Sequence, residues 1–182
     1  MPINFVLLCH ERELQKKSNT GQLLAGCQGV SARTVIWARK APDASLLADI
    51  NDGKTCLVYP LLGTQGHKLT CLEERQQGDT YNRLAVLLPD NPVVVLIDAT
   101  WQQAQKMFNQ SPYLQNIPRL ELARERPSQF RLRRNQKAYG LCTVECAIEL
   151  LRLSGARAEA NQLETNFVGF MSLPKVSCGE SE

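Results

Sequence analysis

The sequence predicts an α/β fold in which helices flank both faces of a mostly parallel sheet. The first observation is a run of five apolar residues, Val93 to Ile97, of which four are β-branched. Because this run does not alternate with polar residues, it is typical of a strand buried on both faces of a parallel sheet. The second observation is that a turn and a helical pattern follow the run directly, as in the repeating unit of α/β folds.

The helix after this strand is predicted to begin at Trp101. Thr100 and Gln103 have the spacing of a capping box, in which two side chains bind the free backbone N–H groups of a helix start. Apolar residues then recur at helical spacing, at Ala104, Met107 and Phe108. Asp98 follows the strand at its carboxyl end, where open α/β sheets bind their ligands. The same position also suits a carboxylate that only caps the helix, and Trp101 alone is typical of a core residue as well.

Other segments complete the predicted sheet and its helices. Short apolar stretches predict strands at 3–9, 34–38 and 55–59, and 119–122 is a further candidate. Helices are predicted after three start signals, which are Ser18-Asn19-Thr20, Pro42-Asp43 and the turn Tyr139-Gly140-Leu141. Gly53 and Gly155 suit the ends of the second and third of these helices. A last helix is predicted over about 156–171, with a core stripe formed by Leu163, Phe167, Phe170 and Met171.

Length and composition favour one domain over residues 1–173, followed by a flexible tail at 174–182. The chain has 182 residues, 43% of them hydrophobic, and a net charge of +3, which permits an anionic partner without demanding one. No apolar stretch has the length of a membrane span, and no signal-peptide pattern is present. We therefore expect a cytoplasmic protein without a membrane partner.

The chain has seven cysteines, but no two of them form a C-x-x-C pair, so the spacing of a zinc site is absent. Cys142 and Cys146 lie four residues apart and can share one face of a helix, yet two thiols do not complete a metal site. We expect free, mostly buried thiols in a reducing compartment and no bound metal.

Residues 124–137 are strongly basic, because they contain six Lys or Arg residues and one acidic residue. Within them, Arg131 and Arg133 alternate with apolar residues, a period of two that predicts a strand with one basic face. A basic strand face suits contact with the phosphates of a nucleic acid. A solvated charge run is the alternative, and it is the commoner one in proteins at large.

Five short blocks of the chain, taken together, resemble the DTW-domain family in content and order. The blocks are His10-Glu11-Arg12-Glu13 with Lys17-Ser18-Asn19-Thr20-Gly21, Tyr59-Pro60, Asp98-Ala99-Thr100-Trp101, Arg131-Leu132-Arg133 and Thr143-Val144-Glu145. The resemblance runs from about His10 to Leu151, which is most of the chain. The Cys-rich cluster that several members have before their His-x-x-Glu block is absent from this sequence, so the RNA target is left open.

The resemblance implies a SPOUT-like fold with a carboxyl-terminal knot. It also implies an enzyme that transfers the 3-amino-3-carboxypropyl group of S-adenosylmethionine to N3 of a uridine in tRNA. The implied partners are therefore tRNA and S-adenosylmethionine, which serves as a co-substrate, and no metal is implied. The oligomeric state and the position of the modified uridine do not follow from it.

The resemblance also assigns roles to particular residues. Asp98, with Thr100 and Trp101, is placed in the catalytic centre, where a carboxylate can accept the proton of uridine N3 or orient the base. The cofactor is expected among strand-end loops, at Tyr59, Pro60, Leu96, Asp98, Leu141, Thr143 and Glu145. The RNA is expected at His10, Lys17, Asn19, Arg131, Arg133 and Arg134. One of the arginines can instead pair with the carboxylate of the transferred arm, and Glu145 with its ammonium group.

Two other functions are compatible with the sequence. A SPOUT-type RNA methyltransferase would use the same cofactor and transfer a different carbon, so the mass of the product separates it from the first hypothesis. An RNA-binding module without catalysis would depend on the basic segment 124–137 alone. Such a module has no activity for an Asp98→Ala change to remove.

Overall fold

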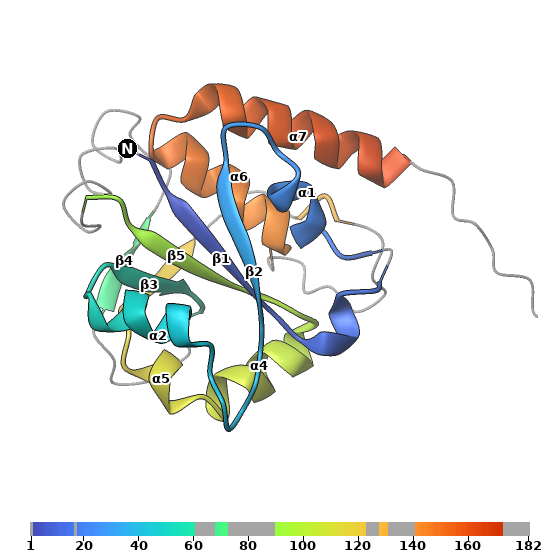
Figure 1. The fold of residues 1–182 in the computed structure, drawn as a ribbon. Coiled ribbons are helices and arrows are strands. Elements are labelled where there is room, and N and C mark those ends of the chain that lie inside the picture. The colour runs from blue at the N-terminus through green and yellow to red at the C-terminus, as the bar shows by residue number, and fades with distance from the viewer. Residues whose placement is uncertain are drawn as a thin grey trace, which may run out of the picture.

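The computed structural model describes residues 2–16, 18–60, 68–72, 90–122, 128–130 and 141–172. Their centre is one six-stranded sheet in the order β2-β1-β5-β3-β6-β4, in which all the described strand pairs are parallel (Figure 1). The strands are β1 (Asn4–Cys9), β2 (Ser31–Ile36), β3 (Thr55–Val58), β4 (Lys68–Leu72), β5 (Val93–Asp98) and β6 (Arg119–Leu122). The parallel sheet predicted from the sequence is therefore confirmed.

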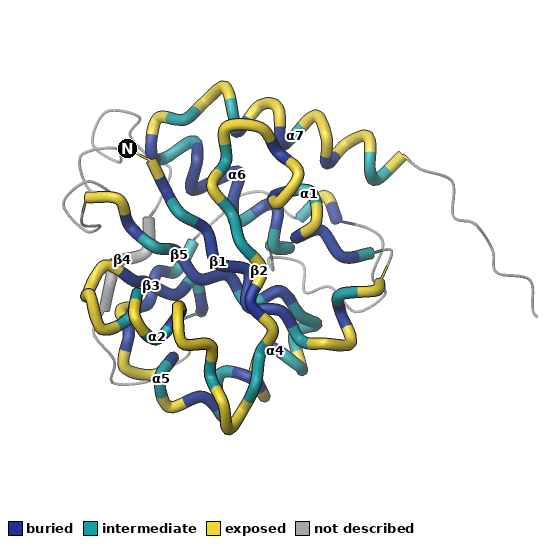
Figure 2. Tube along the Cα trace, viewed as in Figure 1, coloured by how far each residue is buried: buried dark blue, intermediate teal, exposed yellow. Residues whose placement is uncertain are grey.

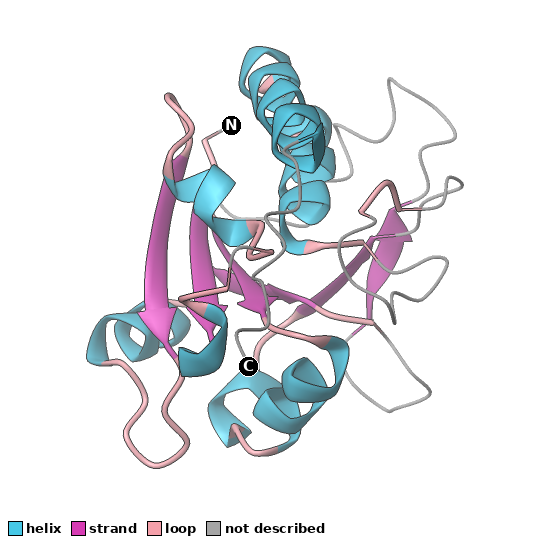
Figure 3. Cartoon of the chain, turned by 90° about the vertical axis from the view of Figure 1, so that its right-hand side faces the viewer, coloured by secondary structure: helices cyan, strands magenta, loops and turns pink. Residues whose placement is uncertain are grey.

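Helices cover both faces of this sheet, as Figures 1 and 3 show. One layer contains α1 (Gly21–Ala25), α6 (Thr143–Leu153) and α7 (Arg157–Ser172), and the other contains α2 (Ala44–Asn51), α4 (Trp101–Asn109) and α5 (Pro112–Gln115). A single 3-10 turn, η1 (Glu11–Glu13), follows β1. No helix among the described residues has the length and apolar character that a membrane span requires.

Alternate residues of each central strand enter the two hydrophobic cores on either side of the sheet. In β1, Phe5 and Leu7 pack in the core under α1, α6 and α7, whereas Val6 and Leu8 pack in the core under α2, α4 and α5. Both faces are thus apolar, which explains why these strands appear in the sequence as continuous hydrophobic runs. Figure 2 shows the same strands as buried segments between helices whose outer sides are exposed.

The strongest local signals in the sequence mark real element boundaries. Thr100 and Gln103 form the predicted capping box at the start of α4. Gly53 and Gly155 have φ angles of 74° and 85° after α2 and α6, a backbone conformation that glycine adopts without steric cost. In α7, Leu163 and Phe167 are buried as predicted, and Phe170 and Met171 are partly buried against the same core.

Several elements differ from the prediction, and two of them, the edge strand β4 (Lys68–Leu72) and the 3-10 turn η1, were not predicted at all. Strand β2 runs from Ser31 to Ile36, whereas a strand at 34–38 was predicted. The prediction was displaced because β2 is an edge strand in which only Val35 is buried. Its polar first residues carry no hydrophobic signal, so the sequence pattern does not show them. The short helix α5 was absent from the predicted elements, since Pro112 at its start suits a loop as well as a first helical position.

Some predictions concern segments outside the described residues. The carboxyl-terminal knot depends on the path of the chain between β6 and α6, most of which is not described. The same is true of the basic strand around 131–134 and of the flexible tail at 174–182. These features stay predictions.

Candidate active site at the carboxyl ends of β1 and β5

The candidate site lies where β1 and β5 run side by side at the centre of the sheet. Their register pairs Asn4 with Val93 at one end and Cys9 with Asp98 at the other. The helix that follows β1 packs on one face of the sheet, and the helix that follows β5 packs on the opposite face. A pair of neighbouring strands whose connections leave in opposite directions is the point where open α/β sheets bind ligands.

Asp98 is the charged residue at this point, and it is only 3% exposed. Its Oδ1 accepts a hydrogen bond of 2.9 Å from the hydroxyl of Thr143, the first residue of α6. Its Oδ2 lies 3.7 Å from the sulfur of Cys9, within reach of the thiol hydrogen. A carboxylate this deeply buried is costly unless donors satisfy its oxygens, and these two groups act as such donors.

Cys9 has a thiol that is held in the protonated form. Burial raises the pKa of this thiol to about 12, and the neighbouring Asp98 carboxylate adds to the shift. The thiol is therefore a hydrogen-bond donor at neutral pH rather than a nucleophile. The carbonyl of His10 lies 3.5 Å from the same sulfur and is its second possible acceptor.

Asn19 lies in the connection between β1 and α1 and is 3% exposed. Its Nδ2 donates to the carbonyl of Glu13 at 3.1 Å, and its Oδ1 accepts from the backbone N–H of Gly21 at 2.8 Å. Asn19 was expected at the RNA. Both ends of its amide make hydrogen bonds inside the protein, and a contact with RNA stays a prediction.

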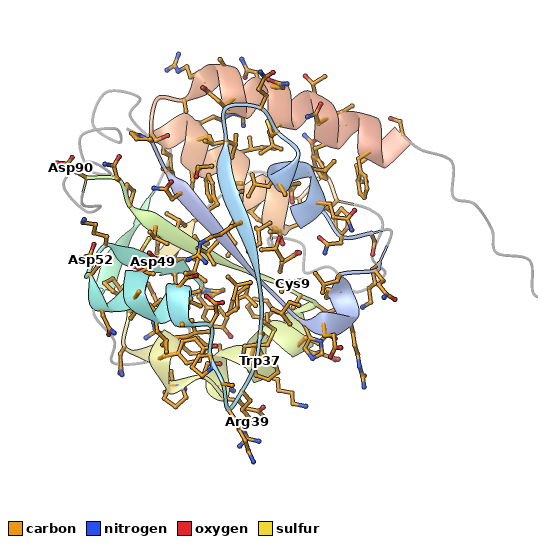
Figure 4. The ribbon with its side chains drawn as sticks, in the orientation of Figure 1. Cys9, Trp37, Arg39, Asp49, Asp52 and Asp90 are labelled. Atoms are coloured by element: carbon orange, nitrogen blue, oxygen red, sulfur yellow. The ribbon has the colours of Figure 1, made fainter. Side chains whose placement is uncertain are left out.

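His10 lies at the end of β1 and is half-buried. Its Nδ1 accepts a hydrogen bond of 3.2 Å from the backbone N–H of Arg12, so the neutral ring carries its hydrogen on Nε2. The ring stacks against Trp37 with the centroids 5.8 Å apart, and the indole N–H of Trp37 donates to Ser111 at 2.8 Å. Figure 4 shows Cys9 at the carboxyl end of β1 and Trp37 beside α4. His10 is therefore fixed next to the site.

An aromatic column, formed by Trp101, Tyr59 and Phe108, lies on the α4 side of the site. Tyr59 stacks on Phe108 with centroids 4.3 Å apart and on Trp101 with centroids 6.1 Å apart, and each pair of rings is nearly parallel. The guanidinium of the buried Arg119 lies over the Phe108 ring at 5.5 Å. Burial raises the pKa of the Tyr59 phenol, so the column contains no ionised ring at neutral pH.

Thr100 has a structural role as well as a position near the site. Its Oγ1 caps the start of α4 by accepting from the backbone N–H of Gln103, whose side chain in turn accepts from the N–H of Thr100. This capping box fixes the angle at which α4 leaves β5. It thereby fixes the start of α4, where the Trp101 ring stacks on Tyr59.

Glu145 lies in the first turn of α6 and is also 3% exposed. Its Oε2 accepts from the hydroxyl of Ser128 at 2.6 Å and from the backbone N–H of Cys142 at 2.9 Å, and its Oε1 accepts from the N–H of Gln129 at 2.8 Å. The carboxylate thus joins the segment 128–130 to the start of α6. Its expected contact with the cofactor is not tested by this arrangement.

For the remaining predicted site residues in the described part of the chain, the structure gives a position or burial but no contact within the site. Pro60 follows Tyr59 and is half-buried, and Leu141 is half-buried just before α6. Leu96 is buried in the core beneath α1, α6 and α7, two residues before Asp98 and on the same face of β5. Lys17, Arg131, Arg133 and Arg134 lie outside the described residues.

Several residues of the site were missed by reasoning from sequence, namely Cys9, Gly21, Trp37, Arg119 and Ser128. Cys9 had a usable signal, since it ends the first predicted strand and pairing this strand with the central one places it beside Asp98. The contacts of Ser128 and Arg119 depend on tertiary structure and leave no local pattern.

The described residues contain a hollow away from this site and no cluster of possible metal ligands. Within the described ranges, no three His, Cys, Asp or Glu side chains gather as metal ligands do. A hollow of about 480 Å³ lies at the amino ends of β1 and β2, lined by residues that include Ile3, Ser31 and Glu159. This hollow is at the edge of the sheet opposite Asp98, so it does not belong to the candidate active site.

Comparison with known proteins adds two similarities. The family model described as the DTW domain matches residues 1–174. The tRNA-uridine aminocarboxypropyltransferase 2 of Mus musculus is 27% identical over 154 residues, which are 81% of this chain and 46% of that protein. The chain therefore spans about half the length of this curated relative. No solved structure matches the chain significantly.

Proposed function

The chain belongs to the DTW domain family, and on this premise we propose that it is an aminocarboxypropyltransferase that modifies tRNA. In this proposal it moves the 3-amino-3-carboxypropyl group of S-adenosylmethionine to N3 of a uridine. The name of the mouse relative supports the class of reaction and of substrate. The fold of such an enzyme is proposed to be SPOUT-like, with a knot near the carboxyl terminus, and its location is proposed to be the cytoplasm.

The observation that carries the proposal is the position of Asp98. It is a buried carboxylate at the carboxyl ends of β1 and β5, whose following helices pack on opposite faces of the sheet. One carboxylate oxygen accepts from Thr143, and the other lies next to Cys9. Uridine N3 carries a proton and is a poor nucleophile until that proton leaves. A fixed carboxylate within hydrogen-bond reach can accept the proton as the nitrogen attacks.

The reaction then balances without a metal. The bond from N3 to the terminal methylene of the arm forms while the bond from that methylene to sulfur breaks. The sulfonium becomes a neutral thioether, and the proton of N3 goes to Asp98. Because three carbons are attached to the sulfonium, the product depends on which carbon lies in line with the attacking nitrogen. Binding geometry therefore decides between transfer of the arm and transfer of a methyl group.

The aromatic column is proposed to position a base. Trp101 begins α4 directly after the turn that holds Asp98, and it is half-buried, with Tyr59 stacked on it. Stacking of a nucleic-acid base on an aromatic side chain contributes about 1–3 kcal/mol to binding and does not depend on the identity of the base. Because Trp101 follows Asp98 by three positions, a base stacked on it is proposed to present its N3 to this carboxylate.

Contact with the tRNA backbone is proposed for residues around the site. His10 lies at the end of β1, and its Nε2–H can donate to a phosphate. The basic residues Lys17, Arg131, Arg133 and Arg134 are proposed to contribute the positive charge, from segments that the sequence places within the family match. S-adenosylmethionine is proposed as co-substrate, with Pro60, Leu141 and the helix-start residue Thr143 around it.

The decisive experiment uses S-adenosylmethionine labelled either in the arm or in the methyl group. Unmodified tRNA is incubated with the protein, digested to nucleosides and analysed by mass spectrometry. The proposal expects the arm label in a uridine whose N3 is substituted. Methyl label in the RNA would identify a methyltransferase instead. Tight tRNA binding with neither label transferred would identify a binding module.

A further inference from the structure

Gly21 lies unusually close to the carboxylate of Asp98. A Cβ atom at this position would lie 2.5 Å from Oδ2 and 2.9 Å from Cγ of Asp98, which is closer than real side chains approach. The described glycines with positive φ are Gly29, Gly53 and Gly155, so Gly21 has a backbone conformation that alanine adopts freely. The position is therefore a glycine because of the space that Asp98 occupies.

Asn19 prevents Gly21 from moving away from this contact. The N–H of Gly21 donates to Oδ1 of Asn19 at 2.8 Å, and Nδ2 of Asn19 is held by the carbonyl of Glu13 at 3.1 Å. Oδ1 of Asn19 would itself lie 3.1 Å from a Cβ on residue 21. A side chain at this position thus meets fixed groups on two sides.

Cys9 contacts the same carboxylate oxygen, Oδ2 of Asp98. Its sulfur lies 3.7 Å from Oδ2 of Asp98, across the β1–β5 register, and 3.9 Å from Nδ2 of Asn19. The thiol is fully buried and keeps its hydrogen. It can thus accept from Asn19 while it donates to Asp98.

We propose that Cys9, Asn19 and Gly21 form a seat that fixes Oδ2 of Asp98 for its part in the reaction. Gly21 leaves the space for the oxygen, Asn19 holds Gly21 in place, and Cys9 donates a hydrogen bond to the oxygen. Thr143 holds the second oxygen, so the plane of the carboxylate is set. The three residues are positioning residues that act through Asp98, and the inference rests on the proposed function of that carboxylate.

The first test compares Gly21→Ala with Gly26→Ala at the other end of α1. A Cβ at Gly26 meets only the carbonyl of Gln22 at 3.6 Å, an ordinary contact, so this variant is the matched control. Gly26 has φ −93° and ψ −1°, and Gly21 is not among the described glycines with positive φ, so alanine fits the backbone at both positions. Because a displacement of about 1 Å can cost about 10²-fold in rate, we expect Gly21→Ala to lose about that much single-turnover activity. Gly26→Ala should stay near the parent rate.

The second test compares Cys9→Ala with Cys9→Ser. Loss of the thiol donor makes ionisation of Asp98 less favourable, so the acidic limb of the pH–rate profile should move to higher pH in Cys9→Ala. The hydroxyl of serine restores a donor and should move the limb back. If Cys9 only fills space, Cys9→Ala should lower the melting temperature and leave the acidic limb of the pH–rate profile in place.

A measurement without turnover separates this inference from the proposed function. NMR of carbon-labelled aspartate, with Asp98→Asn to assign the resonance, follows the titration of Asp98 itself. The inference expects a higher titration midpoint in Cys9→Ala, a return towards the parent midpoint in Cys9→Ser, and a displaced Asp98 resonance in Gly21→Ala. An unchanged midpoint in Cys9→Ala and an unchanged resonance in Gly21→Ala would overturn it. A chain that shows these shifts and no transfer would refute the proposed function alone.

Discussion

The hydroxyl of Thr143 donates a hydrogen bond of 2.9 Å to Oδ1 of Asp98, although the two residues are 45 positions apart in the chain. This bond joins the start of α6 to the end of β5, on opposite sides of the long segment that contains β6 and the basic residues. The carboxylate of Asp98 therefore joins the end of a central strand to the start of a carboxyl-terminal helix.

The first prediction concerns this bond. Thr143→Val removes the hydroxyl and keeps the shape of the side chain, whereas Thr143→Ser keeps the hydroxyl. A hydrogen bond to a charged group contributes about 1.5–3 kcal/mol, so the valine variant should lose about 10- to 100-fold in single-turnover transfer. The serine variant should lose much less. Equal rates in both variants would show that the bond does not support the reaction.

The second prediction is that Asp98→Asn keeps the fold and loses most of the transfer activity. Asparagine has the same shape and can still accept a hydrogen bond, but it cannot take the proton of N3. Loss of a general base typically costs about 10²–10⁴-fold in rate. The assay is single-turnover transfer at saturating S-adenosylmethionine, beside a melting curve. A large drop in melting temperature with lost cofactor binding would instead show that Asp98 mainly holds the turn together.

The fold could be predicted largely from local signals. The strand at 93–97 and the capping box at Thr100 each depend on a few adjacent residues, and both are confirmed. Edge strand β2 was predicted too late, because burial, which makes strands apolar, is weak at the edge of a sheet. Helix propensity and hydrophobic period also carry little information for α5, which has four residues.

The candidate site was predictable as a set of residues but not as a geometry. Asp98 and Thr143 were both selected, through the family resemblance, yet nothing in the sequence states that they touch. The role of Gly21 depends on how closely the start of α1 approaches the end of β5, since its backbone conformation does not require glycine. Such a role leaves no hydrophobic or charge pattern, and it becomes visible only when the strands are placed side by side.

The third prediction concerns Glu145, whose two oxygens accept three hydrogen bonds from Ser128, Gln129 and Cys142. Glu145→Ala leaves these donors without their acceptor and should lower the free energy of unfolding by about 2–3 kcal/mol. Glu145→Gln keeps a capping-box side chain and should cost less. Urea unfolding of the two variants measures the difference. Weakened binding of S-adenosylmethionine by Glu145→Gln, at unchanged stability, would favour the contact with the amino group of the arm.

The fourth prediction concerns the basic segment. If Arg131 and Arg133 contact phosphates, the affinity for tRNA should fall steeply with salt, and each Arg→Ala change should reduce the slope by about one unit. Lys54→Ala is the control, because Lys54 lies at the amino ends of the parallel strands, away from Asp98, and pairs with Asp52. Filter binding over a salt series measures the slopes. If the slope changes for Lys54→Ala and not for the arginine variants, the RNA binds near the amino ends of the strands instead.

The last prediction follows from the raised pKa of Cys9, which shifts from 9.0 to about 12 in the folded chain. Below the unfolded value, both states keep the proton, and the contribution of the buried thiol to stability is complete. Above it, the unfolded chain releases the proton while the folded chain still holds it, so the free energy of unfolding falls as pH rises from 9.0 towards about 12. The parent chain should therefore lose more stability than Cys9→Ala over this range.

Urea unfolding in a reducing buffer, at about pH 8 and about pH 10, measures both chains. The pKa values of Cys56 and Cys142 are also raised by burial, but these thiols titrate in both proteins and cancel in the comparison. Cys9→Ala should be the less stable protein at the lower pH, because it lacks the buried sulfur, and the gap should narrow at the higher pH. A constant gap would mean that the Cys9 thiol ionises as easily in the folded chain as in the unfolded one. In that case neither burial nor the contact with Asp98 at 3.7 Å would favour the protonated form of the thiol.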